Sequence, residues 1–88
     1  MNMFNFQIRY EQTKENKDKV YHIYVPQKEV ILFGNILESL EGWVFYSTID
    51  SKHSIMLVEV IKDYVSDFDL LLDKMRVCSH YSISNALT

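Results

Sequence analysis

The stretch KEVILFGNILESLEGWVFYSTID, residues 28–50, decides the fold, because a helical pattern, a glycine and a strand pattern follow one another within it. Its first half carries apolar residues at helical spacing and predicts a helix with one buried side. These residues are Val30, Phe33, Ile36, Leu37 and Leu40. Ile31 and Leu32 widen the apolar stripe, so we expect the helix to lie on a sheet, with Gly34 at a close contact.

Gly42 separates this helix from the strand pattern. A glycine there can adopt the left-handed conformation that ends a helix. Residues 43–49, Trp-Val-Phe-Tyr-Ser-Thr-Ile, are mostly aromatic or β-branched and predict a strand that is partly covered on both faces. Asp50 begins the turn after the strand, where its carboxylate is expected to accept hydrogen bonds from the following backbone amides.

Two further strand patterns precede this stretch. In residues 4–11 apolar and polar residues alternate strictly. We therefore expect one buried face made of Phe4, Phe6, Ile8 and Tyr10. Residues 19–25 also alternate, up to Pro26, which cannot donate a hydrogen bond to a sheet. The polar segment between the two patterns lets the strands pair as a hairpin.

A fourth strand and a second helix follow. Residues 55–61 are nearly all apolar apart from Glu59, which is typical of a strand that lies under helices. Ser66 is expected to cap the second helix, with Asp69 completing a capping box. The buried stripe of this helix is expected to contain Phe68, Leu71, Leu72 and Met75.

The predicted order β-β-α-β-β-α specifies the fold class. Short connections favour an α+β fold, a ferredoxin-like antiparallel sheet with two helices on one face. The strand at residues 19–25 would be central, and the N-terminal strand could take the edge beside it. We expect residues 1–77 to form a single α+β domain with this extra N-terminal strand, and residues 78–88 to form a C-terminal tail or a short edge strand.

Composition limits the choice of partner and location. The chain has 88 residues, a net charge of -3 and a pI near 5.5, which argues against a nucleic-acid or anionic-membrane partner. Cys78 is the only cysteine, so an internal disulfide cannot form and the cytoplasm is the expected location. Apolar runs are too short for a membrane span.

A few short motifs carry a family resemblance. They are the strand that ends at Pro26, the run NILESLEG at residues 35–42, and Thr-Ile-Asp at residues 48–50. Over residues 21–75 the chain resembles a small bacterial domain family of unknown function in the ACT-like group. The resemblance implies an ACT-like, ferredoxin-like sandwich, and it raises amino-acid sensing as an alternative function. The loop at residues 25–28 departs from ACT modules that bind amino acids, because it lacks the glycine that is common there.

Residues capable of catalysis or metal binding do not gather in a recognisable motif. His22, His53 and His80 fall on a strand, in a turn and in the tail, without the spacing typical of metal ligands. Two pairs of acidic residues could be proposed for acid–base chemistry, Asp50 with Glu59 and Asp67 with Asp69. Structural roles account for them more simply, because Asp50 lies at a turn and Asp67 and Asp69 lie at the start of a helix. We therefore predict that the protein is not an enzyme and has no catalytic residue, metal site or cofactor.

The sheet face opposite the helices is the main functional candidate. Its predicted residues mix aromatic and polar groups, a composition typical of interfaces. These interface candidates are Gln7, Arg9, His22, Tyr24, Tyr46, Thr48 and Glu59. We predict a non-enzymatic interaction or regulatory module that homodimerises through this face or binds another protein. A small-molecule ligand on the same face and an RNA-binding sheet that stacks bases are the alternatives.

Overall fold

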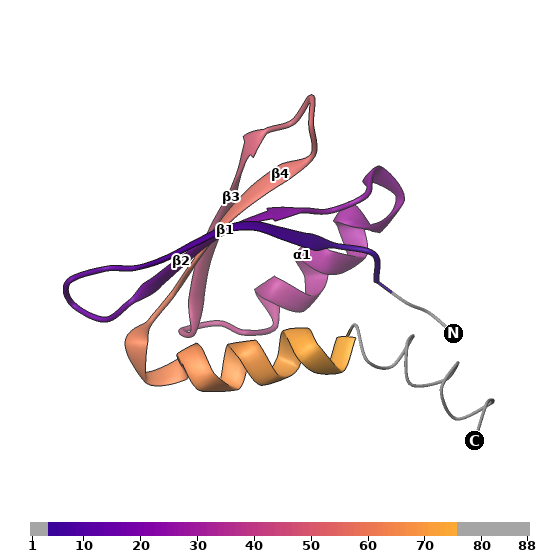
Figure 1. Cartoon of the computed structure of the whole chain (residues 1–88). Coiled ribbons are helices and arrows are strands. Elements are labelled where there is room, and N and C mark those ends of the chain that lie inside the picture. The colour runs from indigo at the N-terminus through magenta and orange to yellow at the C-terminus, as the bar shows by residue number, and fades with distance from the viewer. Residues whose placement is uncertain (1–3, 76–88) are drawn as a thin grey trace, which may run out of the picture.

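The structure is a computed structural model, and it describes residues 4–75 (Figure 1). In chain order it contains β1 (Gln7–Thr13), β2 (Lys19–Tyr24), the 3-10 turn η1 (Gln27–Glu29), α1 (Val30–Glu38), β3 (Val44–Asp50), β4 (Ile55–Val60) and the 3-10 turn η2 (Lys62–Tyr64). A second helix follows η2 and is described over residues 65–75. Cys78, His80 and the predicted tail at residues 78–88 lie outside the described residues.

The four strands form one antiparallel sheet in the order β1-β2-β4-β3. Figure 1 shows α1 and the second helix on the same side of this sheet. The predicted α+β fold is therefore confirmed, and the element order is consistent with a ferredoxin-like fold. Strand β2 is central as predicted, and β1 takes the edge beside it by hairpin pairing.

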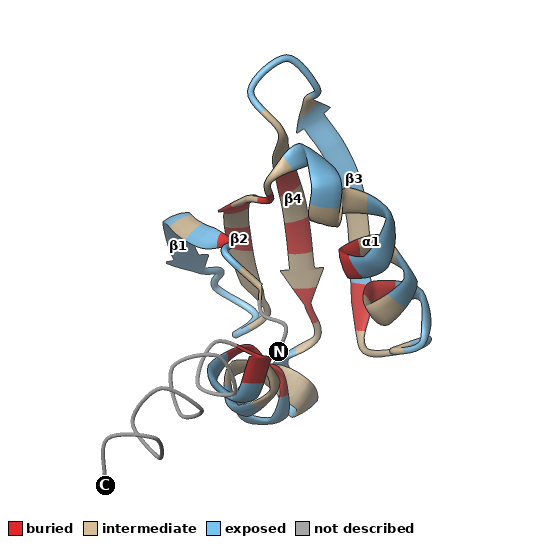
Figure 2. Cartoon of the chain, turned by 90° about the vertical axis from the view of Figure 1, so that its right-hand side faces the viewer, coloured by how far each residue is buried: buried red, intermediate tan, exposed pale blue. Residues whose placement is uncertain are grey.

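The hydrophobic core lies between the sheet and the two helices. Buried and partly buried residues alternate along β2 and β4, which appear as alternating bands in Figure 2. This alternation follows from the pleat, which directs successive side chains to opposite faces. The buried core residues are Phe6, Tyr21, Ile23, Val25, Phe33, Leu37, Val44, Met56, Val58, Val60, Phe68, Leu72 and Met75. The predicted stripe of the second helix is thus confirmed, with Leu71 packed against the core.

A β-bulge in β1 overturns part of the predicted alternation. Ile8 pairs with Ile23, but the next registered pair is Tyr10 with His22, so Arg9 is an extra residue. Because the bulge inserts one residue, the strand presents opposite faces before and after it. Phe6 is buried as expected, whereas Tyr10 is 47% exposed and lies on the face opposite the core.

Helix α1 uses a narrower apolar stripe than predicted. Phe33 and Leu37 are buried, but Ile31 and Leu32 are exposed and point away from the sheet. Gly34 makes no close contact, because a Cβ added there would meet nothing within 4 Å. The expectation of close packing at Gly34 is therefore wrong.

Gly42 lies beyond the end of the helix rather than directly at it. Helix α1 ends at Glu38, and a turn then closes with the Trp43 amide donating to the Leu40 carbonyl at 2.9 Å. Gly42 has φ +88° within this turn. Only glycine adopts that conformation without strain, so the predicted left-handed glycine is confirmed at a slightly different place.

The second helix begins without the predicted capping box. The turn η2 leads directly into helical residue Val65, so Ser66 is inside the helix and cannot serve as its N-cap. The Asp69 carboxylate instead accepts a hydrogen bond from the Tyr21 hydroxyl of β2, and so ties the helix to the sheet. Burial of Tyr21, then this hydrogen bond, raises the Tyr21 pKa above its ordinary value.

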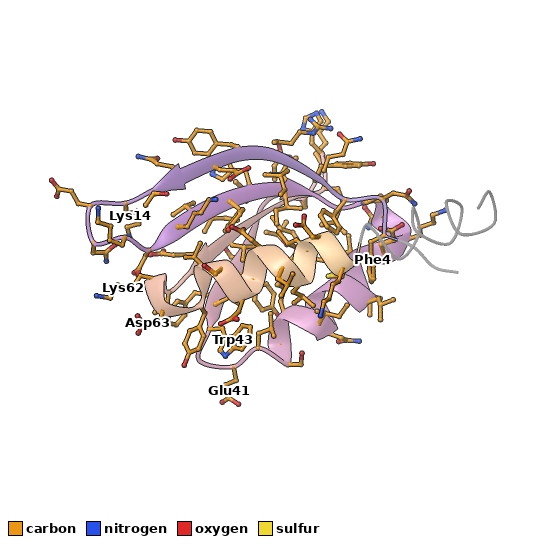
Figure 3. The ribbon with its side chains drawn as sticks, turned by 60° about the horizontal axis from the view of Figure 1, so that its bottom comes forward. Phe4, Lys14, Glu41, Trp43, Lys62 and Asp63 are labelled. Carbon is orange, nitrogen blue, oxygen red and sulfur yellow. The ribbon has the colours of Figure 1, made fainter. Side chains whose placement is uncertain are left out.

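An aromatic stack joins the entrance of β3 to the start of the second helix. The rings of Trp43 and Tyr64 are nearly parallel, with centroids 4.8 Å apart. The Trp43 carbonyl also accepts a hydrogen bond from the Ile61 amide at 2.9 Å. Figure 3 shows Trp43 and Asp63 away from Phe4, which lies near the other end of the second helix.

Candidate interaction surface

The sheet face turned away from both helices forms the candidate surface, and we call it the open face. Within residues 4–75 no element covers it. Directly opposed residues in a sheet lie on one face, so the strand register defines its members as three rows across the strands. The rows are Gln12–Val20–Glu59–Phe45, Tyr10–His22–Leu57–Ser47 and Gln7–Tyr24–Ile55–Asp50. Arg9 adds to the last row from the β1 bulge.

All four strands contribute apolar or aromatic side chains to the open face. Phe45 is 64% exposed, and the Tyr10 ring lies 4.9 Å from the His22 ring between their centroids. Val20, Tyr24, Ile55 and Leu57 are half-buried by their neighbours on the sheet itself. A contiguous patch of this kind on a small domain is typical of an interaction site.

The charged groups of the open face are held by local partners. The Lys14 ammonium lies 2.6 Å from the Glu59 carboxylate, and the hydrogen bond between them raises the Lys14 pKa. At the other end of the face, the Asp50 carboxylate contacts the His53 ring at 2.9 Å and accepts a hydrogen bond from the His53 amide at 3.0 Å. These two hydrogen bonds lower the Asp50 pKa. The predicted turn-capping role of Asp50 is confirmed.

Arg9 is oriented over the face by two contacts. Its guanidinium carbon lies 5.1 Å from the centre of the Tyr24 ring, within the range of a cation–π interaction. Its Nε donates to the Gln7 side-chain oxygen at 3.2 Å. Gln7, Arg9 and Tyr24 therefore form a small polar and aromatic group at one end of the face.

Five of the seven predicted interface residues lie on the open face: Gln7, Arg9, His22, Tyr24 and Glu59. Tyr46 and Thr48 do not, because they pair with Val58 and Met56 on the helix side of the sheet. The Tyr46 hydroxyl donates to Glu38 of α1 at 2.8 Å, and this hydrogen bond raises the Tyr46 pKa. Their predicted orientation is wrong, since both alternations of β3 contain apolar or aromatic residues and the pattern alone does not reveal the core side.

The apolar members of the open face were missed by the sequence reasoning. The alternation in residues 4–11 predicts a buried Tyr10, because the bulge at Arg9 has no sequence signal. Phe45 lies in the alternation of β3 opposite to the predicted one. Val20, Ile55 and Leu57 could have been found, since they alternate with the buried residues of β2 and β4.

The described residues bring no metal-binding cluster together. Among residues 4–75, no group of three or more histidine, cysteine, aspartate or glutamate side chains could hold a metal ion. Asp50 and Glu59 belong to different rows, two rows apart, so they do not form a carboxylate pair. Asp69, a member of the other acidic pair, accepts a hydrogen bond from the Tyr21 hydroxyl.

Comparisons with known proteins leave the family unassigned. No family model, curated protein or solved structure matches the chain. The ACT-like resemblance and the amino-acid sensing that it implies therefore stay predictions. Within the described part of the chain, no helix has the length and apolar character needed to cross a membrane.

Proposed function

We propose that the protein is a non-enzymatic interaction module that homodimerises through its open face. The supporting observation is the group of apolar and aromatic side chains on this face, Tyr10, Val20, Leu57 and Phe45, which no described element covers. Burial of apolar area of this kind is the main driving force of protein association. The face also contains aromatic residues, which are enriched in interface cores.

A second copy suits this face better than a strongly charged partner. A twofold interface brings the same patch of two subunits together, so the patch must be complementary to itself. Along the strands of the open face two positive groups, Arg9 and Lys14, stand against two negative groups, Asp50 and Glu59. Two copies can therefore meet without strong repulsion, and their apolar side chains can lie against each other.

Mass measurement by light scattering after size exclusion tests this proposal. We expect the wild-type protein to approach twice its 10.5 kDa chain mass as its concentration rises toward millimolar values. Phe45→Glu should return it to the monomer, because the substitution places carboxylates in the desolvated patch of both subunits. Phe45 is well exposed in one chain, so the variant should still fold.

Ile31→Glu is the matched control. Ile31 is also an exposed apolar residue, 79% accessible, but it lies on α1, on the other side of the molecule. We expect this variant to dimerise as the wild type does. A monomer at all concentrations would contradict the proposal, as would a dimer that Ile31→Glu disrupts and Phe45→Glu leaves intact.

Single-stranded RNA is the rival partner, because exposed aromatics on a sheet can stack bases. Tyr10 and Phe45 have the exposure that stacking needs. Against it, the net charge is -3, and Lys14 on this face is already paired with Glu59. Salt-dependent binding of a labelled oligouridine that Phe45→Glu abolishes would favour RNA over a second copy.

A further inference from the structure

A cleft of about 580 Å³ lies at the end of the open face next to the β3–β4 turn. Each of the four strands contributes at least one residue to its lining. Its main lining residues are Arg9, Tyr24, Asp50, Lys52, His53 and Ile55. The volume is in the range of small-molecule sites, and the cleft is distinct from the position of Phe45, which lies toward the other end of β3.

Both irregularities of the sheet are located at this cleft. One is the bulge between Ile8 and Tyr10, whose extra residue is Arg9. The other lies between Thr48 and Asp50, and Asp50 itself lines the cleft. Bulges redirect side chains and are over-represented beside functional sites, because they place a residue where a regular strand cannot. Here two separate bulges redirect the strands at the same cleft.

The cleft carries positive charge without matching partners. Within residues 4–75, neither Arg9 nor Lys52 forms an ion pair with a carboxylate. The one carboxylate lining the cleft, Asp50, already contacts the His53 ring and accepts a hydrogen bond from the His53 amide. On a protein whose net charge is -3, this leaves a local excess of positive charge.

We infer that this cleft binds a small organic anion. The carboxylate or phosphate of the ligand lies between the Arg9 guanidinium and the Lys52 ammonium, where N–H groups other than Arg9 Nε, which donates to Gln7, can donate to it. The apolar part of the ligand lies against Tyr24 and Ile55, which form the apolar lining of the cleft. This site does not depend on the proposed dimer.

Fragment binding followed by nuclear magnetic resonance tests the inference. The probes are benzoate, phenyl phosphate and the neutral benzyl alcohol, titrated into protein that carries Phe45→Glu, so that binding is measured without the proposed dimer. We expect both anions to shift the amide signals of Ser54 and Ile55 and the Arg9 Nε signal, with dissociation constants on the order of millimolar, as is typical of fragments. Benzyl alcohol should leave them unchanged.

Charge variants locate the binding groups. Arg9→Gln and Lys52→Gln should each weaken both anions about tenfold, the usual loss for a hydrogen bond to a charged group. Lys74→Gln is the control, because Lys74 is on the second helix and does not line the cleft. Equal shifts with benzyl alcohol, no saturable binding, or unchanged affinity in both Arg9→Gln and Lys52→Gln would overturn the inference. These outcomes do not depend on whether the protein is a monomer or a dimer. Failure of the cleft proposal can therefore be distinguished from failure of the proposed dimer.

Discussion

At the scale of single residues, Arg9 determines which side chains of β1 meet the core. As the extra residue of the bulge, it leaves Phe6 buried and directs Tyr10 onto the open face beside His22. A regular strand would place Tyr10 and Phe6 on the same face. One inserted residue thus adds an aromatic ring to the candidate surface, and to the neighbouring cleft a guanidinium that forms no ion pair within the described residues.

The two glycines lead to opposite stability predictions. Gly34 lies inside α1 with free space at the Cβ position, so Gly34→Ala should stabilise the protein by about 1 kcal/mol through helix propensity and reduced entropy of the unfolded chain. Gly42 has φ +88°, so Gly42→Ala should destabilise it by about 1–2 kcal/mol. Urea denaturation of both variants measures the difference. Destabilisation by Gly34→Ala would show that this residue packs closely after all.

The environment of Tyr21 leads us to expect that the free energy of unfolding changes at alkaline pH. Its ring is fully buried and its hydroxyl donates to Asp69, so Tyr21→Phe should cost about 1–2 kcal/mol at pH 7. Burial and this hydrogen bond raise the folded-state pKa of Tyr21 above the unfolded value near 10. The unfolded chain therefore loses this proton first, and the stabilisation is complete below about pH 10 and declines above it.

The measurement is the difference in free energy of unfolding between wild type and Tyr21→Phe at several pH values. Comparing the two proteins cancels the titration of the lysines and of the other tyrosines. We expect this difference to be constant from pH 7 to about pH 9 and to shrink at about pH 10.5. A difference that stays constant over the whole range would contradict the raised pKa.

At the scale of secondary-structure elements, the stack of Trp43 on Tyr64 joins β3 to the second helix. Tyr64→Ala should cost about 1–2 kcal/mol, because it removes the ring contact and the apolar area buried with it. Trp43 is the only tryptophan, so its fluorescence reports the same change. We expect its emission to shift to longer wavelength in Tyr64→Ala and to stay unchanged in Tyr10→Ala, which alters a distant ring.

The helices and strands were predictable where the pattern of apolar residues along the sequence matches the side that the structure buries. The alternating residues of β2 and β4 and the apolar stripe of the second helix follow directly from the pleat and the helical period. Ser66 shows the limit of such reasoning: it resembles a helix cap, but η2 starts the helix earlier and leaves it inside. The sequence pattern also predicts Ile31 and Leu32 on the buried stripe, but α1 buries only one narrow side and both residues are exposed.

The candidate surface was less predictable than the fold, because its location depends on which face of each strand meets the helices. Strand β3 could bury either Phe45 or Tyr46, and only the register with β4 decides this. The bulge at Arg9 depends on pairing with β2 and leaves no pattern in the sequence. Long-range pairing therefore determines the surface, whereas local periodicity determines the elements.

At the scale of the whole molecule, the proposed dimer predicts that thermal stability depends on protein concentration. Association with a second folded copy stabilises the folded state by mass action, so the Tm should rise by a few degrees for each tenfold increase in concentration. The Phe45→Glu variant should unfold at a Tm that does not vary with concentration. Scanning calorimetry or fluorimetry over a hundredfold range tests this, and an invariant wild-type Tm would contradict dimerisation.

The strand order β1-β2-β4-β3 leaves two edges on the sheet, and they are protected unequally. Strand β1 has the charged residues Arg9 and Glu11 together with a bulge, features that hinder the addition of a further strand. Strand β3 has no charged residue before Asp50, and its backbone groups on the outer side are not paired within the described residues. If the protein aggregates when heated or destabilised, we expect β3 to nucleate the growing cross-β assembly.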